Sequence, residues 1–563
     1  MSSPPILLDR AGSRYCVHGG HLSLEMHIFR HTQREMTVAA AWAACTAAQQ
    51  RGDRLGLLLA AARLECGLSD RWSAQAGGVD DESPRRQAAV RWSQAAAEWY
   101  LKRRTEALLP DRGCPWEDGG AMLHCSDPEG LRYYSLNVDG YAVAARRWQA
   151  AAAEGTPAWV LGLRTMGSTL APVVWAALRP PSGDVAHRCT TLRPQGDPQR
   201  RVIRISDRLR RRMQAWAGAF LIVDEGPGLS GSSFAGTVML LQSLGVSPMR
   251  IVLLPSWEVD AAAAARLSSP IAARQWTGWR CYPAEPLTAP DGEPLHGGVW
   301  RQRLGHGVTT PVWGTHERLK YLTGGGRTLT KFGGVGPYGV ATWERARRLA
   351  RAGWGPEVVG SAADAAAGWV VYRCLRVRRL AARPGQAWAE WAGNYLAWRR
   401  SEYALGGAVP PTPELAEMLP INLGRLRWTM RPPPMVEAVP VALDARLQRC
   451  EWGVTRSGWV KFDGADHGDD PFFPGPADIA WDLAGIAVEF GSAPGAAVVA
   501  AYCRHSGETA AALAPRLAWH RLAYGAFHAA FCAFAATQVA PDEAFRFWRA
   551  GRRYRAAVES AAG

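Results

Sequence analysis

Residues 220–233 constrain the fold of this chain more than any other segment. The apolar run 220–223 has the length and composition of a strand buried on both faces of a parallel sheet. Two adjacent carboxylates, Asp224 and Glu225, follow the strand, then a loop rich in glycine and serine, then an apolar run that predicts a helix. Such a unit offers loop amides and a helix N-terminus to a phosphate, and carboxylates to hydroxyls or a metal.

A second unit of the same kind lies upstream. Residues 158–163 predict a strand, and a short polar loop and an apolar helix reaching residue 178 follow it. Between the two units, residues 188–205 carry several arginines, with proline and glycine interruptions: Arg188, Arg193, Arg200, Arg201 and Arg204. This composition favours a mobile basic flap over an anion.

Together, the two units resemble the type I phosphoribosyltransferases. The resemblance implies a doubly wound parallel sheet over residues 126–285, with 5-phosphoribosyl diphosphate (PRPP) as substrate and Mg²⁺ as cofactor. It implies that the upstream loop, with Arg164, Gly167, Ser168 and Thr169, holds the diphosphate, and that the basic segment is the family's hood. In the downstream loop Asp224 and Glu225 would bind the ribose hydroxyls. The residues implied for the 5-phosphate are Ser230, Gly231, Ser232 and Ser233.

The downstream loop departs from the family pattern by one residue. Six residues separate Asp224 from Gly231, one more than is usual. Either the loop contains an extra residue, or Glu225 takes the first acidic place. The resemblance therefore leaves the separate roles of the two carboxylates open.

The last third of the chain carries a second set of spaced charges. The glycines 324–326 predict a hairpin turn, and the strand-like segment 328–332 that follows presents Lys331. A helical segment presents Glu344 thirteen residues later, residues 368–372 predict another strand, and residues 496–561 predict a helical tail. Further on, two apolar runs end in Asp444 and, nineteen residues later, in Asp463. Asp482 follows after another nineteen residues.

This order resembles the aminoglycoside phosphotransferase-like kinases, which have a bilobal α+β fold. The resemblance implies that Lys331 and Glu344 pair to hold ATP, that Asp444 is the catalytic base and that Asp463 binds Mg²⁺. Asp482 would be a structural acid. The family's asparagine position holds Arg449, so Glu451 is the expected substitute metal ligand. The acidic run 463–470 allows a two-metal site or a solvated loop, and we favour one metal bound through Asp463.

The bulk composition limits the partners. The net charge of +15 suits polyanionic ligands, namely nucleotides, PRPP or nucleic acid, and equally suits a basic, arginine-rich proteome. No run of 18 apolar residues predicts a membrane span, and the first residues lack the features of a signal peptide, so we expect a cytoplasmic protein. Nucleic acid is not an expected partner, because the 26 tryptophans are spread along the chain and no nucleic-acid motif occurs. A homo-oligomer is compatible with the sequence.

The sequence thus predicts an α/β multidomain protein. We expect a helical N-terminal region over residues 1–125, the phosphoribosyltransferase-like domain over 126–285, a linker over 286–315 and the kinase-like domain over 316–563. The resulting hypothesis is a bifunctional enzyme that combines PRPP-dependent phosphoribosyl transfer, or its reverse, with ATP-dependent phosphorylation of a small molecule. The alternative is a nucleotide-sensing regulatory or stress-defence protein whose kinase-like domain is degenerate.

Overall fold

The computed structural model describes residues 7–8, 14–19, 22–27, 33–104, 114–116, 119–178, 187–197, 199–303, 309–408, 413–428, 432–466, 468, 470, 472–473 and 475–562. The chain divides into two compact units. The middle unit is Thr32–Ala289, and the C-terminal unit is Pro290–Gly563 together with Met1–His31. The boundary after Ala289 lies within the stretch 286–315 expected to be a linker. The helices that follow Thr32, expected in a separate N-terminal region, belong to the same unit as residues 126–285.

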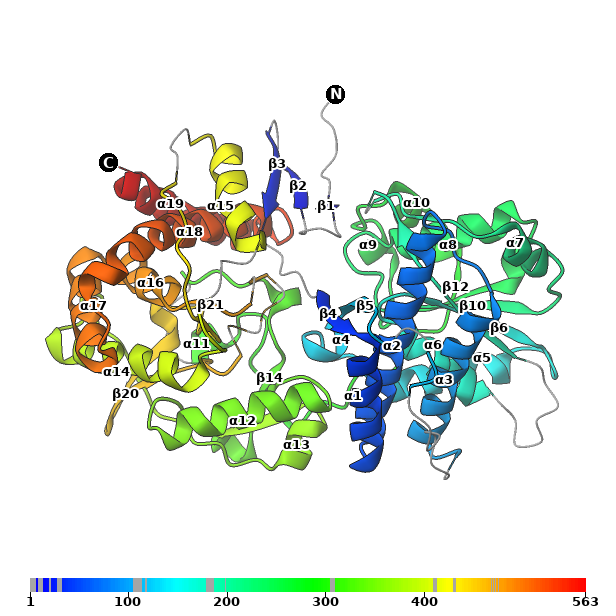
Figure 1. Cartoon of the computed structure of the whole chain (residues 1–563), viewed down its shortest axis with the longest axis horizontal. Coiled ribbons are helices and arrows are strands. Elements are labelled where there is room, and N and C mark those ends of the chain that lie inside the picture. Colours follow the sequence, from blue (N-terminus) through cyan, green and yellow to red (C-terminus); the bar gives the residue numbers. More distant parts are fainter. Residues whose placement is uncertain are drawn as a thin grey trace. The chain divides into compact units, whose positions relative to one another are not determined.

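A five-stranded parallel sheet organises the middle unit (Figure 1). Its strands are β6 (Ala158–Leu163), β7 (Arg188–Leu192), β10 (Ala219–Val223), β11 (Ile251–Leu254) and β12 (Arg280–Cys281), in the order β12-β11-β10-β6-β7. Every neighbouring pair is parallel. Every residue of β6 and β10 is buried, which explains why both segments are apolar without alternation. The two strands expected from the sequence are therefore confirmed.

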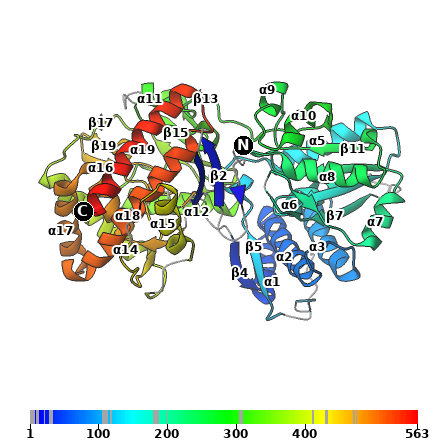
Figure 2. The ribbon, with the colours of Figure 1, turned by 90° about the horizontal axis from the view of Figure 1, so that it is seen from above.

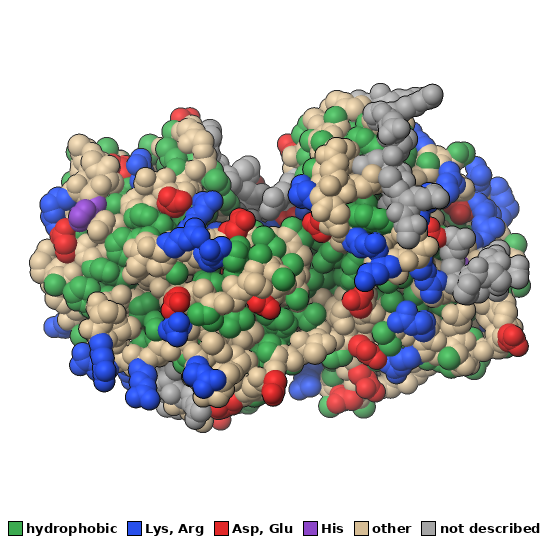
Figure 3. All heavy atoms as spheres, turned by 90° about the horizontal axis from the view of Figure 1, so that it is seen from below, with side chains coloured by type: hydrophobic (Ala, Val, Ile, Leu, Met, Phe, Trp, Pro, Cys, Tyr) green, Lys and Arg blue, Asp and Glu red, His purple; other side chains and the backbone are tan. Residues whose placement is uncertain are grey.

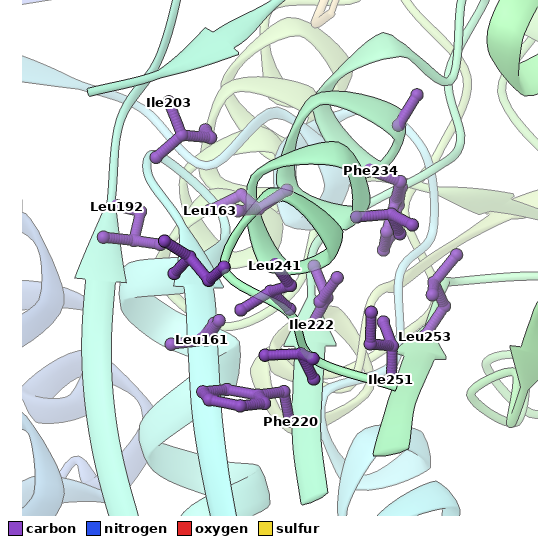
Figure 4. Packing of buried hydrophobic residues seen from close by; sticks show 14 of the residues in the cluster. Leu161, Leu163, Leu192, Ile203, Phe220, Ile222, Phe234, Leu241, Ile251 and Leu253 are labelled. Carbon is purple, nitrogen blue, oxygen red and sulfur yellow. The ribbon is translucent and has the colours of Figure 1, made fainter. Parts of the chain in front are cut away.

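Helices cover both faces of this sheet. On one face, apolar side chains of the strands pack against α7 (Asp207–Gln214) and α8 (Ser232–Ser243) in a continuous core that includes Phe220, Ile222, Phe234 and Leu241 (Figure 4). On the other face lies α6 (Gly167–Leu178): a Cβ atom added to Gly162 would stand 2.7 Å from the Cβ of Ala171 in that helix. Glycine at position 162 therefore allows α6 to approach the sheet closely.

The remaining elements of the middle unit surround this sheet. α1 (Val38–Gln50), α2 (Arg54–Gln75) and α3 (Pro84–Tyr100) share a second apolar core, and confirm the helices expected in this region. The other elements are β4 (Gln33–Thr37), β5 (Met122–Ser126), α4 (Glu129–Arg132), α5 (Val138–Ala151), β8 (Pro194–Gln195), β9 (Val202–Ile203), α9 (Ala261–Ala264) and α10 (Pro270–Gln275).

The basic segment 188–205 is not a flap throughout. Its first five residues form β7, the edge strand of the sheet, where Thr190, Thr191 and Leu192 are buried. The rest contains the antiparallel hairpin β8–β9. Burial of these side chains against the sheet explains why the expected mobile segment begins with regular structure.

The C-terminal unit starts with an antiparallel four-stranded sheet, β13 (Gly292–Pro294), β14 (Lys320–Thr323), β15 (Thr328–Phe332) and β16 (Trp369–Arg373). The glycines 324–326 form the turn between β14 and β15, as expected, and all three have positive φ angles. α12 (Pro337–Arg351) follows β15, and α13 (Ala362–Ala366) precedes β16. The helix after the Lys331 strand and the strand at 369–373 agree with the sequence prediction.

Helices dominate the rest of this unit (Figure 2). They are α11 (Trp300–Arg303), α14 (Gln386–Tyr403), α15 (Pro413–Arg425), α16 (Ala480–Phe490), α17 (Ser492–Ser506), α18 (Ala510–Ala535) and α19 (Pro541–Ala562), which confirm the expected helical tail. The strands are β17 (Arg378–Arg379), β18 (Pro440–Val441), β19 (Trp452–Thr455), β20 (Gly458–Lys461) and β21 (Ala477–Asp478), with β1 (Leu7–Leu8), β2 (Arg14–Gly19) and β3 (Leu22–His27) as a separate sheet. Among the described residues, no helix combines the length and the apolar character needed to cross a bilayer.

Candidate functional site

The two predicted phosphate loops of the middle unit lie side by side. β6 and β10 are adjacent and parallel, with Gly162 opposite Val223, so both loops leave the sheet at the same edge. The loops are also in close contact, because a Cβ added to Gly167 would be 3.0 Å from the carbonyl oxygen of Val223. β7 and β11 lie on opposite sides of this strand pair. The edge is therefore the switch point at which open α/β sheets bind ligands.

The downstream loop delivers the N-terminus of α8 to this edge. Gly231 precedes the helix with a φ of 68°, and a Cβ there would meet the Cβ of Ala272 at 2.9 Å. Ser230 and Ser232 bond to each other through their hydroxyls at 2.9 Å. Ser233 is half-buried in the first turn of α8. The predicted phosphate residues therefore gather at the N-terminus of a twelve-residue helix, where the partial positive charge of the helix dipole favours an anion.

The two acidic residues lie at the end of β10 in a half-buried position. Asp224 Oδ1 accepts a hydrogen bond from the amide of Glu225 at 2.8 Å, and Tyr141 donates to the Asp224 carbonyl at 2.8 Å. Burial raises the pKa of Asp224 to about 8. Burial, with the negative charges of Glu129 and Asp224, raises the pKa of Glu225 to about 8. Glu129 of α4 was not found from the sequence, because it lies far upstream and belongs to no motif.

Ion pairs anchor the upstream loop. The Arg164 side chain, expected on the diphosphate, is buried and contacts Asp80 at 2.7 Å and Asp70 at 3.1 Å. Arg193 at the end of β7 donates to the Arg164 carbonyl oxygen at 2.6 Å and to Asp70. The guanidinium of Arg164 thus anchors the loop, and its expected contact with a diphosphate stays a prediction.

The other predicted residues of this loop stand at the start of α6. Gly167, Ser168 and Thr169 are buried in its first turn, and the Ser168 hydroxyl is a buried polar group with no hydrogen-bond partner. An unpaired buried hydroxyl costs free energy unless a ligand or water bonds to it. The backbone and hydroxyls of this turn therefore remain candidates for binding a diphosphate. The anchoring acids Asp70 and Asp80 were missed because their segment reads as an ordinary helix and loop.

In the C-terminal unit, Lys331 lies between two carboxylates. Its ammonium is 2.9 Å from Asp463 Oδ1 and 3.0 Å from Asp466 Oδ2, and Arg318 Nε is 3.3 Å from Asp466. Burial alone would lower the pKa of Lys331, but the two carboxylates raise it above its usual range. The Asp463 side chain is 28% exposed, whereas that of Asp466 is 4% exposed. This cluster joins β15 to the loop that follows β20.

The expected pair between Lys331 and Glu344 is not formed. Glu344 lies on the exposed side of α12. The neighbouring Arg345 points toward the cluster instead, and its Nε donates to the carbonyl oxygen of Ala465 at 2.7 Å. Lys331 is therefore neutralised by Asp463 and Asp466 in place of Glu344.

Asp444, expected to be the catalytic base, is completely buried. Its carboxylate contacts Lys461 Nζ at 3.0 Å and accepts a hydrogen bond from the Tyr395 hydroxyl at 2.5 Å. Asp482 accepts hydrogen bonds at 2.9 Å from the amides of Asp444 and Ala445, consistent with the structural role expected of it. Burial and the charge of Asp444 raise the pKa of Asp482 to about 7. Asp444 thus lies in a buried network with Lys461 and Tyr395, and its expected role as catalytic base stays a prediction.

The predicted metal ligand Glu451 lies close to a positive charge. Burial lowers the pKa of Arg446, but Asp470 first, and then Glu451, Asp466 and Asp463, raise it. Arg446 forms an ion pair with Asp470. His467 and Asp469 of the predicted acidic run lie outside the described residues. An arginine among these acids opposes a second metal ion near Glu451.

The fit to one Mg²⁺ ion rests on two carboxylates. The described part of the chain contains no cluster of three or more histidine, cysteine, aspartate or glutamate side chains that could hold a metal. Mg²⁺ often binds through one or two carboxylates, with phosphates and water completing its shell. Asp463 and Asp466 satisfy this minimal requirement, with Asp463 open to solvent.

Comparisons with known proteins identify only structural neighbours. No family model matches the chain, and no curated protein matches it. A choline/ethanolamine kinase family protein from Mesorhizobium loti aligns at 18% identity and a TM-score of 0.29, covering 53% of this chain and 98% of that one. A type I macrolide 2′-phosphotransferase aligns at 14% and 0.27, covering 44% and 87%. A choline kinase from Streptococcus pneumoniae aligns at 14% and 0.28, covering 46% and 98%.

The buried pair between Lys461 and Asp444 gives a stability prediction. We expect Lys461→Met to lower the free energy of unfolding by about 3–5 kcal/mol, because it leaves a buried carboxylate without its cation. The double variant Asp444→Asn/Lys461→Met should regain most of this loss. Urea denaturation monitored by circular dichroism measures both. If the free energy of unfolding of Lys461→Met equals that of the original chain, the structural role of Asp444 is contradicted.

The raised pKa values of Asp224 and Glu225 give a pH prediction. Between about pH 4 and pH 8 the folded unit keeps protons that the unfolded chain has released, so its free energy of unfolding falls as the pH rises. We expect Asp224→Asn/Glu225→Gln to flatten this dependence and to be more stable than the original chain at about pH 8. Urea midpoints at several pH values test this, with Glu154→Gln, an exposed loop substitution, as control. Equal slopes for all three proteins would refute it.

Proposed function

We propose that the C-terminal unit binds Mg²⁺–ATP and that the chain is an ATP-dependent phosphotransferase acting on a small molecule. The observation that carries this proposal is the position of Lys331, whose ammonium lies within 3.0 Å of both Asp463 and Asp466. Phosphoryl transfer requires cations that bind phosphate oxygens and carboxylates that bind a metal ion. The cluster contains both kinds of group, since Lys331 and Arg318 lie beside the two aspartates. Asp463 is the carboxylate of this cluster that solvent reaches.

The acidic and the basic residues of this cluster would have different roles. Asp463 and Asp466 would hold Mg²⁺, which supplies neutralisation of negative charge on the phosphate oxygens. Lys331 and Arg318 would bind phosphate oxygens directly. Phosphoryl transfer passes through a loose transition state, so positioning and charge stabilisation contribute more than a strong base. The burial of Asp444 is therefore compatible with transfer to an acceptor hydroxyl, in which the bond to the leaving ADP breaks as the bond to the acceptor forms.

Substitution of Asp463 tests this site. We expect Asp463→Asn to weaken Mg²⁺–ATP binding about tenfold or more, because it removes one of two metal ligands, which corresponds to about 1.4 kcal/mol or more. Isothermal titration calorimetry measures the affinity, and Glu417→Gln, an exposed change on α15, serves as control. Glu344→Gln should also bind normally. If Glu344→Gln weakens Mg²⁺–ATP binding while Asp463→Asn does not, the Mg²⁺–ATP site does not lie at Asp463.

For the middle unit we propose binding of PRPP, with phosphoribosyl transfer or its reverse. This second function is favoured by the adjacency of the loops after β6 and β10 at the switch point of a parallel sheet. The N-terminus of α8, with Ser230, Ser232 and Ser233, would bind the 5-phosphate. The first turn of α6 would bind the diphosphate, while Asp224 and Glu225 bind the ribose hydroxyls. The C1–oxygen bond to pyrophosphate breaks as the bond to the acceptor forms.

The PRPP proposal predicts a loss of binding on neutralising the acidic pair. We expect Asp224→Asn/Glu225→Gln to lower PRPP affinity about tenfold or more at about pH 9, where both carboxyl groups are ionised, because charge-assisted hydrogen bonds to the ribose hydroxyls are lost. Calorimetry with PRPP measures this, and Glu154→Gln is the matched exposed control. Inorganic phosphate should still compete for the α8 N-terminus in the double variant. Unchanged PRPP affinity would exclude the acidic pair from the site.

A regulatory function is the alternative for the C-terminal unit. The burial of Asp444 and the position of Arg446 among the acids favour a unit that binds a nucleotide without turnover. Mg²⁺–ATP would then raise the thermal unfolding midpoint while no ADP forms in the presence of candidate acceptors. Formation of ADP coupled to a phosphorylated acceptor would favour the enzyme.

A further inference from the structure

The outward side of α19 carries a row of aromatic and basic side chains. Phe545 and Trp548 are 58% and 54% exposed, which is unusual for residues of this size. Arg549, Arg552 and Arg555 follow on the same side of the helix and are exposed. These five residues are called the α19 stripe. They span eleven residues of helix, about 15 Å along its axis.

The opposite side of the helix explains why this row faces solvent. Phe547, Tyr554 and Val558 are buried, and α19 packs along α18 through them (Figure 2). The helix therefore already has a complete apolar face inside the unit. Its outer aromatic residues are not needed for the core, so their exposure calls for another explanation.

The planar groups of the stripe are already arranged in a stack. The rings of Phe545 and Trp548 lie nearly parallel, with centroids 6.0 Å apart and planes inclined by 21°. The guanidinium of Arg552 lies over the Trp548 ring at 5.1 Å, and that of Arg555 lies over Trp428 at 5.8 Å. The stripe thus places two aromatic rings next to a group of guanidinium cations, the two kinds of group that bind bases and phosphates in nucleic-acid-binding surfaces.

Two other basic residues of α19 form ion pairs: Arg546 contacts Glu543, and Arg553 contacts Glu489 at 2.6 Å. Within the described part of the chain no ion pair joins an arginine of the stripe to a carboxylate, and Glu559 lies one turn after Arg555. On the face of the molecule seen from below, lysine and arginine side chains are scattered among acidic, neutral and apolar groups (Figure 3). The exposed aromatic rings beside its cations distinguish α19 from a surface that is merely basic.

We propose that the α19 stripe binds single-stranded nucleic acid, with bases stacked on Phe545 and Trp548 and phosphates bound by Arg549, Arg552 and Arg555. A single strand presents both its bases and its phosphates, whereas a duplex hides the faces of its bases. An anionic membrane fits less well, because the apolar face that would insert is already packed against α18. The site is independent of the two nucleotide sites proposed above.

Fluorescence anisotropy with a labelled twelve-nucleotide oligothymidylate tests the proposal on the full chain. We expect Phe545→Ala/Trp548→Ala to lower the affinity about tenfold or more through lost stacking. Arg549→Gln/Arg552→Gln/Arg555→Gln should lower the slope of log affinity against log salt by about 2, since three phosphate contacts are lost. Because all five side chains are exposed, the thermal midpoint should remain unchanged, which separates lost binding from unfolding.

A matched pair of variants controls for net charge. Arg208→Gln/Arg211→Gln on α7 removes two exposed cations that have no neighbouring aromatic stripe. It should retain more affinity than Arg549→Gln/Arg552→Gln. Equal losses in both variants would mean that binding follows total charge and would overturn the proposal. Tighter binding to a duplex of the same length, or binding only to vesicles containing anionic lipid, would overturn it as well.

Discussion

The free-energy cost of burying a carboxylate away from water determines which partners the acidic residues of this protein have. A buried carboxylate needs a cation or several hydrogen-bond donors, since an unpaired one is strongly destabilising. Asp80 is satisfied by Arg164 and Arg86, Asp444 by Lys461 and Tyr395, and Asp466 by Lys331 and Arg318. In each set the partners come from segments far apart in the chain, so these pairs fix loops as well as charges.

The same requirement separates anchoring residues from residues that remain open to a ligand. Arg164 is engaged by two aspartates and by the Thr191 carbonyl oxygen of β7, while the Ser168 hydroxyl in the first turn of α6 is buried without a hydrogen-bond partner. In the C-terminal unit, Asp444 is enclosed in a buried network, but Asp463 keeps contact with solvent while paired with Lys331. The proposed chemistry is therefore placed at Asp463, which faces water, and at the N-termini of α6 and α8, whose partial positive charge favours anions.

The two nucleotide-type sites that we propose would use different chemistry on one chain. In the middle unit, helix N-termini at the edge of a parallel sheet would bind a sugar phosphate, and in the C-terminal unit the charges around Lys331 would bind Mg²⁺–ATP. The proposed α19 stripe would add a surface of exposed aromatic rings and guanidinium groups. These three places would use backbone amides, metal-binding carboxylates and stacking surfaces respectively, so they can be altered independently.

The sequence by itself determined the elements whose signal is local. The buried strands β6 and β10, the helices that follow them, the glycine turn at 324–326 and the helical tail are all visible in apolar runs and turn residues, because burial on a sheet or a helix face imposes a short period. The neighbourhood of the two phosphate loops was decided by the sheet topology, which places β6 directly beside β10. Tertiary structure alone decided that Lys331 pairs with Asp463 and Asp466 rather than with Glu344, and that Asp444 is buried. It also decided that Arg164 serves Asp70 and Asp80, and that two aromatic residues of α19 face solvent. Charge pairing and exposure depend on which distant segments meet in space, and spacing along the chain carries no record of that.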